Sequence, residues 1–397
     1  MERNSFFSKI INRLIAARWG VGVFLCVVLV GVWLAQFVVL PAQLGRVVWF
    51  SLAAADQNLS PFMSYARATV IGLEGLREDE YAGKVVSFQQ DVRIRMDDKE
   101  LVTVFATQPG VLVSKLEVGD EVVVANIGTD PNDYVIVEPY RLPVLWVYIG
   151  VFALLVVLVG FWRGFTALVG LAFSVGVLVF GIIPNILLGH SALLTTLIGG
   201  AVIVLVNTYL AHGLSKRTAL AIASTVIALA LGIGLAFYAL PHALLFGTAD
   251  STALFLQSGL LGALDLSGIL LSAIIIGALG VLDDVVVTQI ESVHQLARAN
   301  QELSMKDLFI RGMVVGRHHI AAVVNTLFLA YVGVALPLLL LLFVTASQPL
   351  WVVLNSEQIA EEIVRTLLGS ATLILAVPLA TVLAAWVYGK QKLMLEE

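Results

Sequence analysis

Long apolar stretches dominate the chain, and one long polar region interrupts them near the N-terminus. A bilayer core takes about 20 consecutive apolar residues per helix, and eight stretches reach that length. The pattern predicts an all-α polytopic membrane protein. Its eight transmembrane helices are expected at residues 20–41, 144–162, 165–184, 192–212, 218–240, 265–287, 319–345 and 366–388.

The first apolar stretch, residues 20–41, is interpreted as an uncleaved signal-anchor helix. It is longer than the roughly 7 to 15 residues of a signal peptide's apolar region, and no clear small-residue cleavage site follows it. The seven later helices then form a membrane domain over residues 144–388.

Basic residues mark one side of the membrane. Lys and Arg precede the first predicted helix and follow the second, fourth, sixth and eighth, whereas the connections 185–191 and 241–264 carry none. Because cytoplasmic loops carry an excess of Lys and Arg, we expect the basic N-terminus, 1–19, and the tail, 389–397, to be cytoplasmic. The expected location is the bacterial plasma (inner) membrane.

Residues 42–143 form the long polar region, and apolar residues there recur at every second position. Val92 and Ile94, for example, alternate with Arg93 and Arg95, which is typical of strands with one buried face. Gly, Pro and Asp separate several such segments. The pattern predicts a small β-barrel, similar to an OB-fold, inserted on the extracytoplasmic side between the first two helices. It could be a lid, a partner-docking module, a receptor or a passive cap.

Composition supports the membrane class and excludes several functions. Of the 397 residues, 59% are hydrophobic and 13% charged, with a mean hydropathy of +0.96, too apolar for a water-soluble domain. The net charge of −5 gives no support for nucleic-acid binding. The single cysteine, Cys26, allows no disulfide within the chain. The sequence contains no HExxH, DDxxD, Walker A, G-x-S-x-G or Rossmann motif, so we expect neither an enzyme nor a cofactor.

The segment "GVLDDVVVTQIESVHQL", 280–296, places two carboxylates at the end of an apolar run. Asp283 lies 18 residues after Asp265, about 27 Å along a helix. The pair is therefore expected near the cytoplasmic interface, where a charge costs less than at mid-membrane. Asp284 begins a polar stripe that continues beyond the span as an amphipathic cytoplasmic segment, 288–316.

The seventh predicted helix has polar residues at a comparable depth. Arg317 is an expected ionic partner for Asp284, and Asn325 an expected hydrogen-bond partner. The candidate polar or ion site consists of Asp283, Asp284, Thr288, Gln289, Glu291, Arg317, His319, Asn325, Thr326 and Tyr331. Secondary intramembrane polar residues are Asn207, Ser224 and Thr225. Two interpretations stay open. The residues could form a path for a cation, proton or polar solute, or they could form a cluster that fixes helix packing. Whether a metal binds is also open.

Two segments resemble the YibE/F-like family of bacterial multi-pass membrane proteins, especially its actinobacterial form. They are "GALGVLDDVVVTQIESVHQL", 277–296, and "LFIRGMVVGRHHIAAVVNTLFLAYVGVALPLLLL", 308–341. The resemblance implies a plasma-membrane protein of unestablished activity, often suggested to be a transporter, with some members encoded as adjacent pairs. One departure is His318, which stands where an acidic residue is expected between Arg317 and His319.

The expected function is that of a transporter-like permease or channel subunit for an ion or small polar solute. The alternative is a non-transporting envelope scaffold or sensor that binds a partner through its outer β domain. Besides the lipid bilayer, the expected partners are a second YibE/F-like protein or further copies of the chain, and no nucleic acid.

Overall fold

The computed structural model describes residues 64–81, 84–96, 99–106, 116–126, 133–249, 264–344 and 349–389. The predicted signal anchor, 20–41, and the predicted cytoplasmic N-terminus, 1–19, lie outside these residues. The chain divides into two compact units, one formed by Ala35–Phe161 and the other by Met1–Leu34 with Trp162–Glu397.

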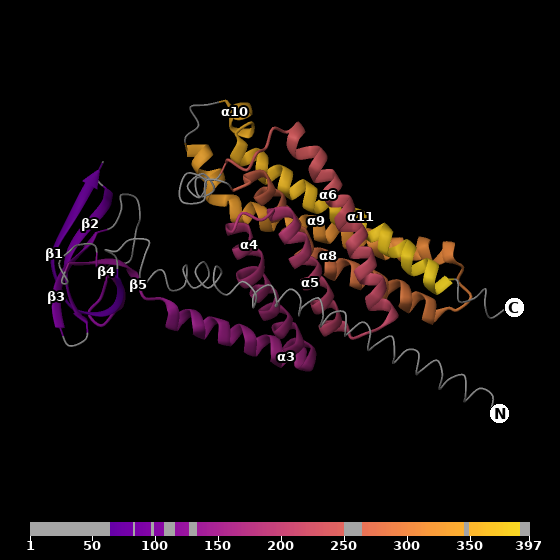
Figure 1. Cartoon of the computed structure of the whole chain (residues 1–397), viewed down its shortest axis with the longest axis horizontal. Helices are drawn as coiled ribbons and strands as arrows, with labels where there is room; N and C mark the ends of the chain where they lie inside the picture. The colour runs from indigo at the N-terminus through magenta and orange to yellow at the C-terminus, as the bar shows by residue number, and fades with distance from the viewer. Residues whose placement is uncertain are drawn as a thin grey trace. The chain divides into compact units, whose positions relative to one another are not determined.

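The first unit contains a five-stranded antiparallel sheet of order β3-β2-β1-β4-β5 (Figure 1). Val92 and Ile94 are fully buried whereas Arg93 and Arg95 are exposed, which confirms the predicted alternation. The hydroxyl of Thr103 on β3 donates a hydrogen bond to the carbonyl of Tyr134 on β5, which connects the two edge strands. The strands are β1 Ser64–Tyr81, β2 Lys84–Met96, β3 Lys99–Ala106, β4 Glu121–Asn126 and β5 Tyr134–Pro139.

The predicted helices 144–162 and 165–184 lie in one helical run of 46 residues, Leu142–Leu187. It comprises α3 Leu142–Val177, the π-helical turn η1 Leu178–Ile182 and α4 Ile183–Leu187. At about 1.5 Å per residue, the parts before and after Phe161 are roughly 29 and 39 Å long, so each is about long enough for one crossing of a bilayer core. Phe161 breaks the run with φ 49° and ψ −131°, a conformation that is uncommon for a bulky side chain.

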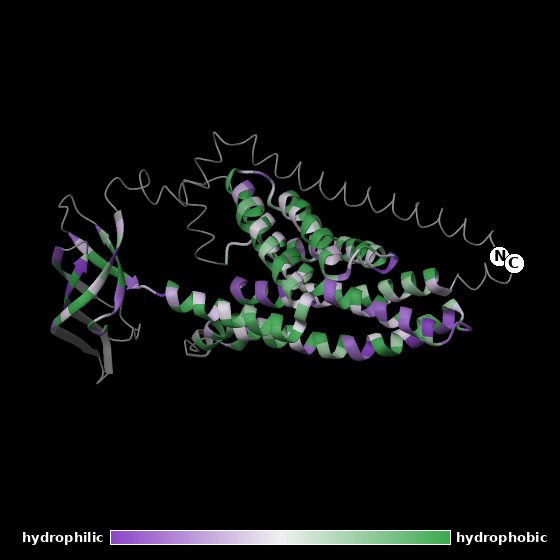
Figure 2. Ribbon diagram, turned by 90° about the horizontal axis from the view of Figure 1, so that it is seen from below, coloured by the Kyte–Doolittle hydropathy of each residue, from purple (hydrophilic) through white to green (hydrophobic). Residues whose placement is uncertain are grey.

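Among the described residues, six helices are long and apolar enough to cross a membrane, with the run Leu142–Leu187 taken as one. Figure 2 shows that apolar residues dominate these helices and that polar residues lie mainly near helix ends. The count of eight is therefore not confirmed, because one predicted span lies outside the described residues and two share one run. The remaining helices are α5 Ala192–His212, α6 Lys216–His242, α8 Leu266–Ala299, α9 Met305–Val344, α10 Leu350–Leu354 and α11 Glu357–Gly389.

Short polar side chains fix where the helices begin. Ser191, Ser215 and Asp265 accept hydrogen bonds from backbone N–H groups at the start of α5, α6 and α8, at 3.4, 3.2 and 2.9 Å. Such N-caps satisfy donors that have no partner within the helix. Gly213, with φ 68°, ends α5, as glycine commonly does at a helix C-terminus.

Helices α8 and α11 form the centre of the second unit, with α6 and α9 packed against them. On α8, Val286, Ile290 and Val293 are fully buried and form an apolar face. They meet small residues of α11 such as Ala380 and Ala384. The 34 residues of α8 span about 51 Å, so the helix extends well beyond one bilayer core.

The predicted amphipathic segment 288–316 contains a reversal of the chain. Helix α8 ends at Ala299, and α9 begins at Met305 after a short turn. The segment is thus the last part of α8, a turn and the first part of α9.

Candidate functional site

The two adjacent aspartates of α8 have different surroundings. Asp283 is partly buried, and its Oδ1 accepts a hydrogen bond of 2.9 Å from the hydroxyl of Thr208 on α5. Thr208 itself is fully buried. Asp284 is exposed and makes no hydrogen bond or ion pair with any described residue. Successive helical residues point about 100° apart, which separates the two carboxylates.

The partners expected from α9 do not reach the aspartates. Arg317 and Asn325 are both exposed, and among the described residues neither bonds to Asp283 or Asp284. The face that α9 turns toward α8 contains Gly312 and Gly316, so the longer side chains on its other faces point elsewhere. The aspartates of α8 therefore do not contact α9 as expected. Asp283 contacts α5 instead, through Thr208.

Gln289 joins three helices in the interior. Its side-chain amide donates to the carbonyl of Gly312 at 2.9 Å and to the hydroxyl of Thr381 on α11 at 2.8 Å. Only 1% of Gln289 is exposed. A Cβ on Gly316 would lie 2.5 Å from a methyl carbon of Val377, so only glycine allows this close approach. Gln289, the two glycines and Thr381 thus form a packing centre. The sequence did not indicate that Thr381 belongs to it.

Glu291 is held in an ion pair with a residue that the sequence did not single out. Its Oε2 accepts from Arg217, at the start of α6, at 2.7 Å, and its Oε1 accepts from the amide of Gln295 at 2.5 Å. One turn further, the ring of His294 packs edge-on against Tyr388 of α11, with 4.8 Å between centroids. The only sequence signal for Arg217 was its membership of a basic connection.

A cleft of about 580 Å³ lies beside this ion pair. Proteins commonly bind small solutes in cavities of roughly 300 to 1,000 Å³. The lining carries charged groups and hydroxyls from several elements, and we call it the α5–α6–α8 cleft. It is lined by Arg163, Ala211, His212, Ser215, Arg217, Thr218, Ala221, Val287, Thr288, Ile290, Glu291, Ser292 and Gln295.

The aspartates lie about one helical turn from this cleft. Val287 and His212 line it, and they follow Asp283 and Thr208 by four residues on α8 and α5. Asp284 likewise precedes Thr288, another lining residue, by four residues. Since residues four apart lie on one face of a helix, the exposed stripe of α8 runs from Asp284 into the cleft.

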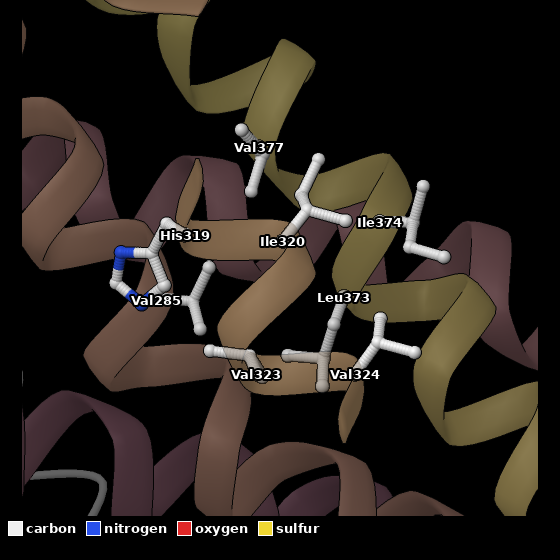
Figure 3. Close-up of a pocket in the computed structure, with 8 residues that line it drawn as sticks. All are labelled: Val285, His319, Ile320, Val323, Val324, Leu373, Ile374 and Val377. Atoms are coloured by element: carbon white, nitrogen blue, oxygen red, sulfur yellow. The ribbon is translucent and has the colours of Figure 1, made fainter. Parts of the chain in front are cut away.

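His319, Thr326 and Tyr331 lie away from the cleft. Figure 3 shows the imidazole of His319 beside Val285 at the edge of an otherwise apolar pocket between α8, α9 and α11. At about 10 Å³ this pocket has room for at most one water. Thr326 donates to the carbonyl of Ala322 on its own helix at 2.9 Å. The hydroxyl of Tyr331 lies 2.9 Å from the place where a Cβ of Gly277 would be.

The secondary polar residues are held differently, because Asn207 bonds to another helix and Ser224 bonds within its own helix. Asn207 donates to the hydroxyl of Ser174 on α3 at 2.7 Å, and Ser224 donates to the carbonyl of Leu220 at 2.8 Å. Ser224 and Thr225 are both fully buried on α6. None of the three lines the cleft.

The opposite end of the second unit contains a further polar contact that the sequence did not indicate. Glu357, at the start of α11, accepts from the N–H of Phe246 at 3.2 Å and the hydroxyl of Thr248 at 2.7 Å. Gln358 donates to the carbonyl of Ala249 at 2.9 Å. These bonds fix residues 246–249, which follow α6, to α11. Within the described ranges, no group of three or more His, Cys, Asp and Glu side chains could hold a metal ion.

A model of the family described as YibE/F-like protein matches residues 148–390. The match covers α4, α5, α6, α8, α9 and α11 and most of α3. No curated protein and no solved structure gives a match.

Proposed function

The chain belongs to the YibE/F-like protein family, and from this premise we propose that it is a transporter-like permease or channel subunit. Its apolar helices indicate an integral membrane protein. The proposed cargo is an ion or small polar solute that enters through the α5–α6–α8 cleft and passes Asp283 and Asp284. The observation that carries the proposal is the charged cleft of about 580 Å³ next to the aspartates.

The polar side of α8 supports this path. Gly280, Asp284, Thr288 and Gln295 are all exposed on α8, which with α11 forms the centre of the second unit. Ionisable residues within membrane-spanning segments are costly, and they usually face a partner, a water-filled cavity or a solute pathway. Asp284 has no partner among the described residues, so a hydrated path is the arrangement that best accounts for its charge.

The proposal includes a topology. Eight membrane helices with both termini in the cytoplasm would place the sheet outside the bacterial plasma membrane and the cleft on the cytoplasmic side. The distribution of Lys and Arg supports this orientation. The bond between Thr103 and Tyr134 supports closure of the sheet into a small OB-like barrel.

The second candidate is an envelope scaffold or sensor, and the surface of the sheet favours it. Tyr65, Val102 and Val137 are 56%, 69% and 49% exposed. Exposed apolar side chains mark protein-binding surfaces when they form one patch. The partner would be a second YibE/F-like protein or another copy of the chain.

Flux through purified protein tests the leading proposal. Proteoliposomes would be given gradients of sodium, potassium, protons, inorganic phosphate and succinate in turn. We expect at least one probe to move faster than in empty liposomes, and Asp284→Asn to slow it about tenfold or more. Asp133→Asn is the matched control, because Asp133 is an exposed aspartate of the other unit. Equal flux in the wild type and Asp284→Asn at comparable folding would remove the proposed path.

A further inference from the structure

The lining of the α5–α6–α8 cleft contains more cationic side chains than carboxylates. Two arginines, Arg163 and Arg217, and one histidine, His212, line it together with a single carboxylate, Glu291. Glu291 is already held by Arg217 and by Gln295. Arg217 is thus neutralised by its partner, and the remaining lining carries excess positive charge.

Arg163 is the arginine of the lining that has no carboxylate partner among the described residues. It is exposed and makes no ion pair or side-chain hydrogen bond with any other residue in the described part of the chain. The side chain of His212 also makes no hydrogen bond or salt bridge there, but it interacts electrostatically with Asp283. A guanidinium presents a rigid fork of N–H donors that matches the two oxygens of a carboxylate or phosphate.

Two hydroxyl groups lie on the same wall of the cleft, and both are already hydrogen-bonded. Ser215 and Thr218 bond to each other, and Thr218 also donates to the carbonyl of Gly213. Ser215 caps α6 and lines the cleft with Arg217 and Thr218. The first turn of α6 therefore adds the partial positive charge of a helix N-terminus.

Two carboxylates, Asp283 and Asp284, lie about one turn away and do not line the cleft. Thr208 holds Asp283, whereas Asp284 is exposed.

We propose that the α5–α6–α8 cleft binds the anionic oxygens of a phosphate or carboxylate group, with Arg163 as the ligand-binding cation and His212 as a further hydrogen-bond donor. This inference rests on the proposed function, since it assigns an anionic group to the molecule that occupies the solute's entrance. The same chemistry belongs to a soluble anion and to the headgroup of an anionic lipid, and the experiment distinguishes these two sources.

Binding is measured by thermal shift on the whole chain in a neutral maltoside detergent. The first probe is inorganic phosphate, and the second is phosphatidylglycerol in mixed micelles, with phosphatidylcholine as its uncharged counterpart. Arg163→Gln is expected to weaken binding about tenfold, the effect of losing one charge-assisted contact. Arg311→Gln, an equal charge change on α9 outside the cleft, should leave binding unchanged.

A second variant changes the charge in the opposite direction. Glu291→Gln frees Arg217 from its ion pair and is expected to strengthen binding several-fold. This result would support the proposal even if Arg163→Gln failed to fold. Weaker binding in Glu291→Gln, or equal losses in Arg163→Gln and Arg311→Gln, would overturn it.

The two probes and the flux assay separate the outcomes. Phosphate binding that depends on Arg163 identifies a soluble anion, whereas binding of phosphatidylglycerol alone identifies a lipid headgroup. If neither probe binds with this dependence, the inference is wrong. If a probe binds but no probe moves across the membrane, the proposed function is wrong and the anion site stands. If cations move across the membrane equally fast in the wild type and in Arg163→Gln, and no anion binds, the anion site is wrong and the proposed function stands.

Discussion

Neighbouring side chains of α8 have different surroundings, because a helix turns about 100° at each residue and so points them at different neighbours. Asp283 bonds to α5, Asp284 is exposed, and Gln289 bonds to α9 and α11. The sequence marked all three as polar residues in an apolar run. It could not separate them, because their roles depend on which neighbouring helix each side chain faces.

Replacing Gln289 tests its role in packing. Gln289→Leu removes two buried hydrogen bonds and is expected to lower stability by about 1 to 3 kcal/mol. Gln301→Leu is the matched control, since Gln301 lies exposed in the turn before α9, and it should change stability by less than about 0.5 kcal/mol. Thermal unfolding in detergent measures both variants. An equal effect of the two substitutions would contradict the packing role.

The ion pair between Arg217 and Glu291 should contribute little to stability. Its side chains are 45% and 40% exposed, and solvent screens pairs of this kind, which are commonly worth about 0 to 1 kcal/mol. Glu291→Gln is therefore expected to lower the free energy of unfolding by less than about 1 kcal/mol. A loss of several kcal/mol would show that the pair holds the fold and is not simply part of the cleft's charge.

At the scale of whole elements, apolar length predicted three helix starts well, whereas α9 and α11 begin 14 and 9 residues before the predicted starts. Helices α5, α6 and α8 begin within two residues of the predicted starts, because a bilayer core fixes the minimum length of an apolar run. The contacts Thr208–Asp283 and Arg217–Glu291 could not be predicted. Each joins residues about 75 positions apart, and it depends on the rotation and order of packed helices, which hydropathy does not encode.

Two glycines of α9 test the close packing of that helix. Gly316 faces Val377, whereas a Cβ on Gly333 would have no atom within 4 Å. Alanine is favoured over glycine within a helix by about 1 kcal/mol. Gly333→Ala should therefore raise the melting temperature or leave it unchanged, while Gly316→Ala should lower it because the helices must separate. Equal shifts in the two variants would contradict the described packing of α9.

At the scale of the whole molecule, the family match and the apolar helices agree on a membrane protein. The sequence also predicted the sheet, because alternation of buried and exposed residues is a local pattern. The cleft was not predicted, since its lining comes from four separate parts of the chain. The proposed function therefore rests on an arrangement that only the three-dimensional structure displays.

The proposed topology can be tested with single cysteines in a Cys26→Ser background. Asp133→Cys lies in the unit with the sheet, and Gln301→Cys lies in the turn between α8 and α9. A membrane-impermeant maleimide is expected to label the first in intact cells and the second only after the membrane is opened. The reverse pattern would contradict the orientation.

The central claim is that solute passes through the α5–α6–α8 cleft, and blocking the cleft tests it most directly. Thr288→Cys places a thiol in the exposed part of its lining, whereas Thr326→Cys places one on the exposed face of α9, outside the cleft. Flux in proteoliposomes would be recorded in the Cys26→Ser background before and after reaction with a bulky methanethiosulfonate reagent. The account predicts that modification stops flux in Thr288→Cys and leaves it unchanged in Thr326→Cys. Full flux through modified Thr288→Cys would contradict it.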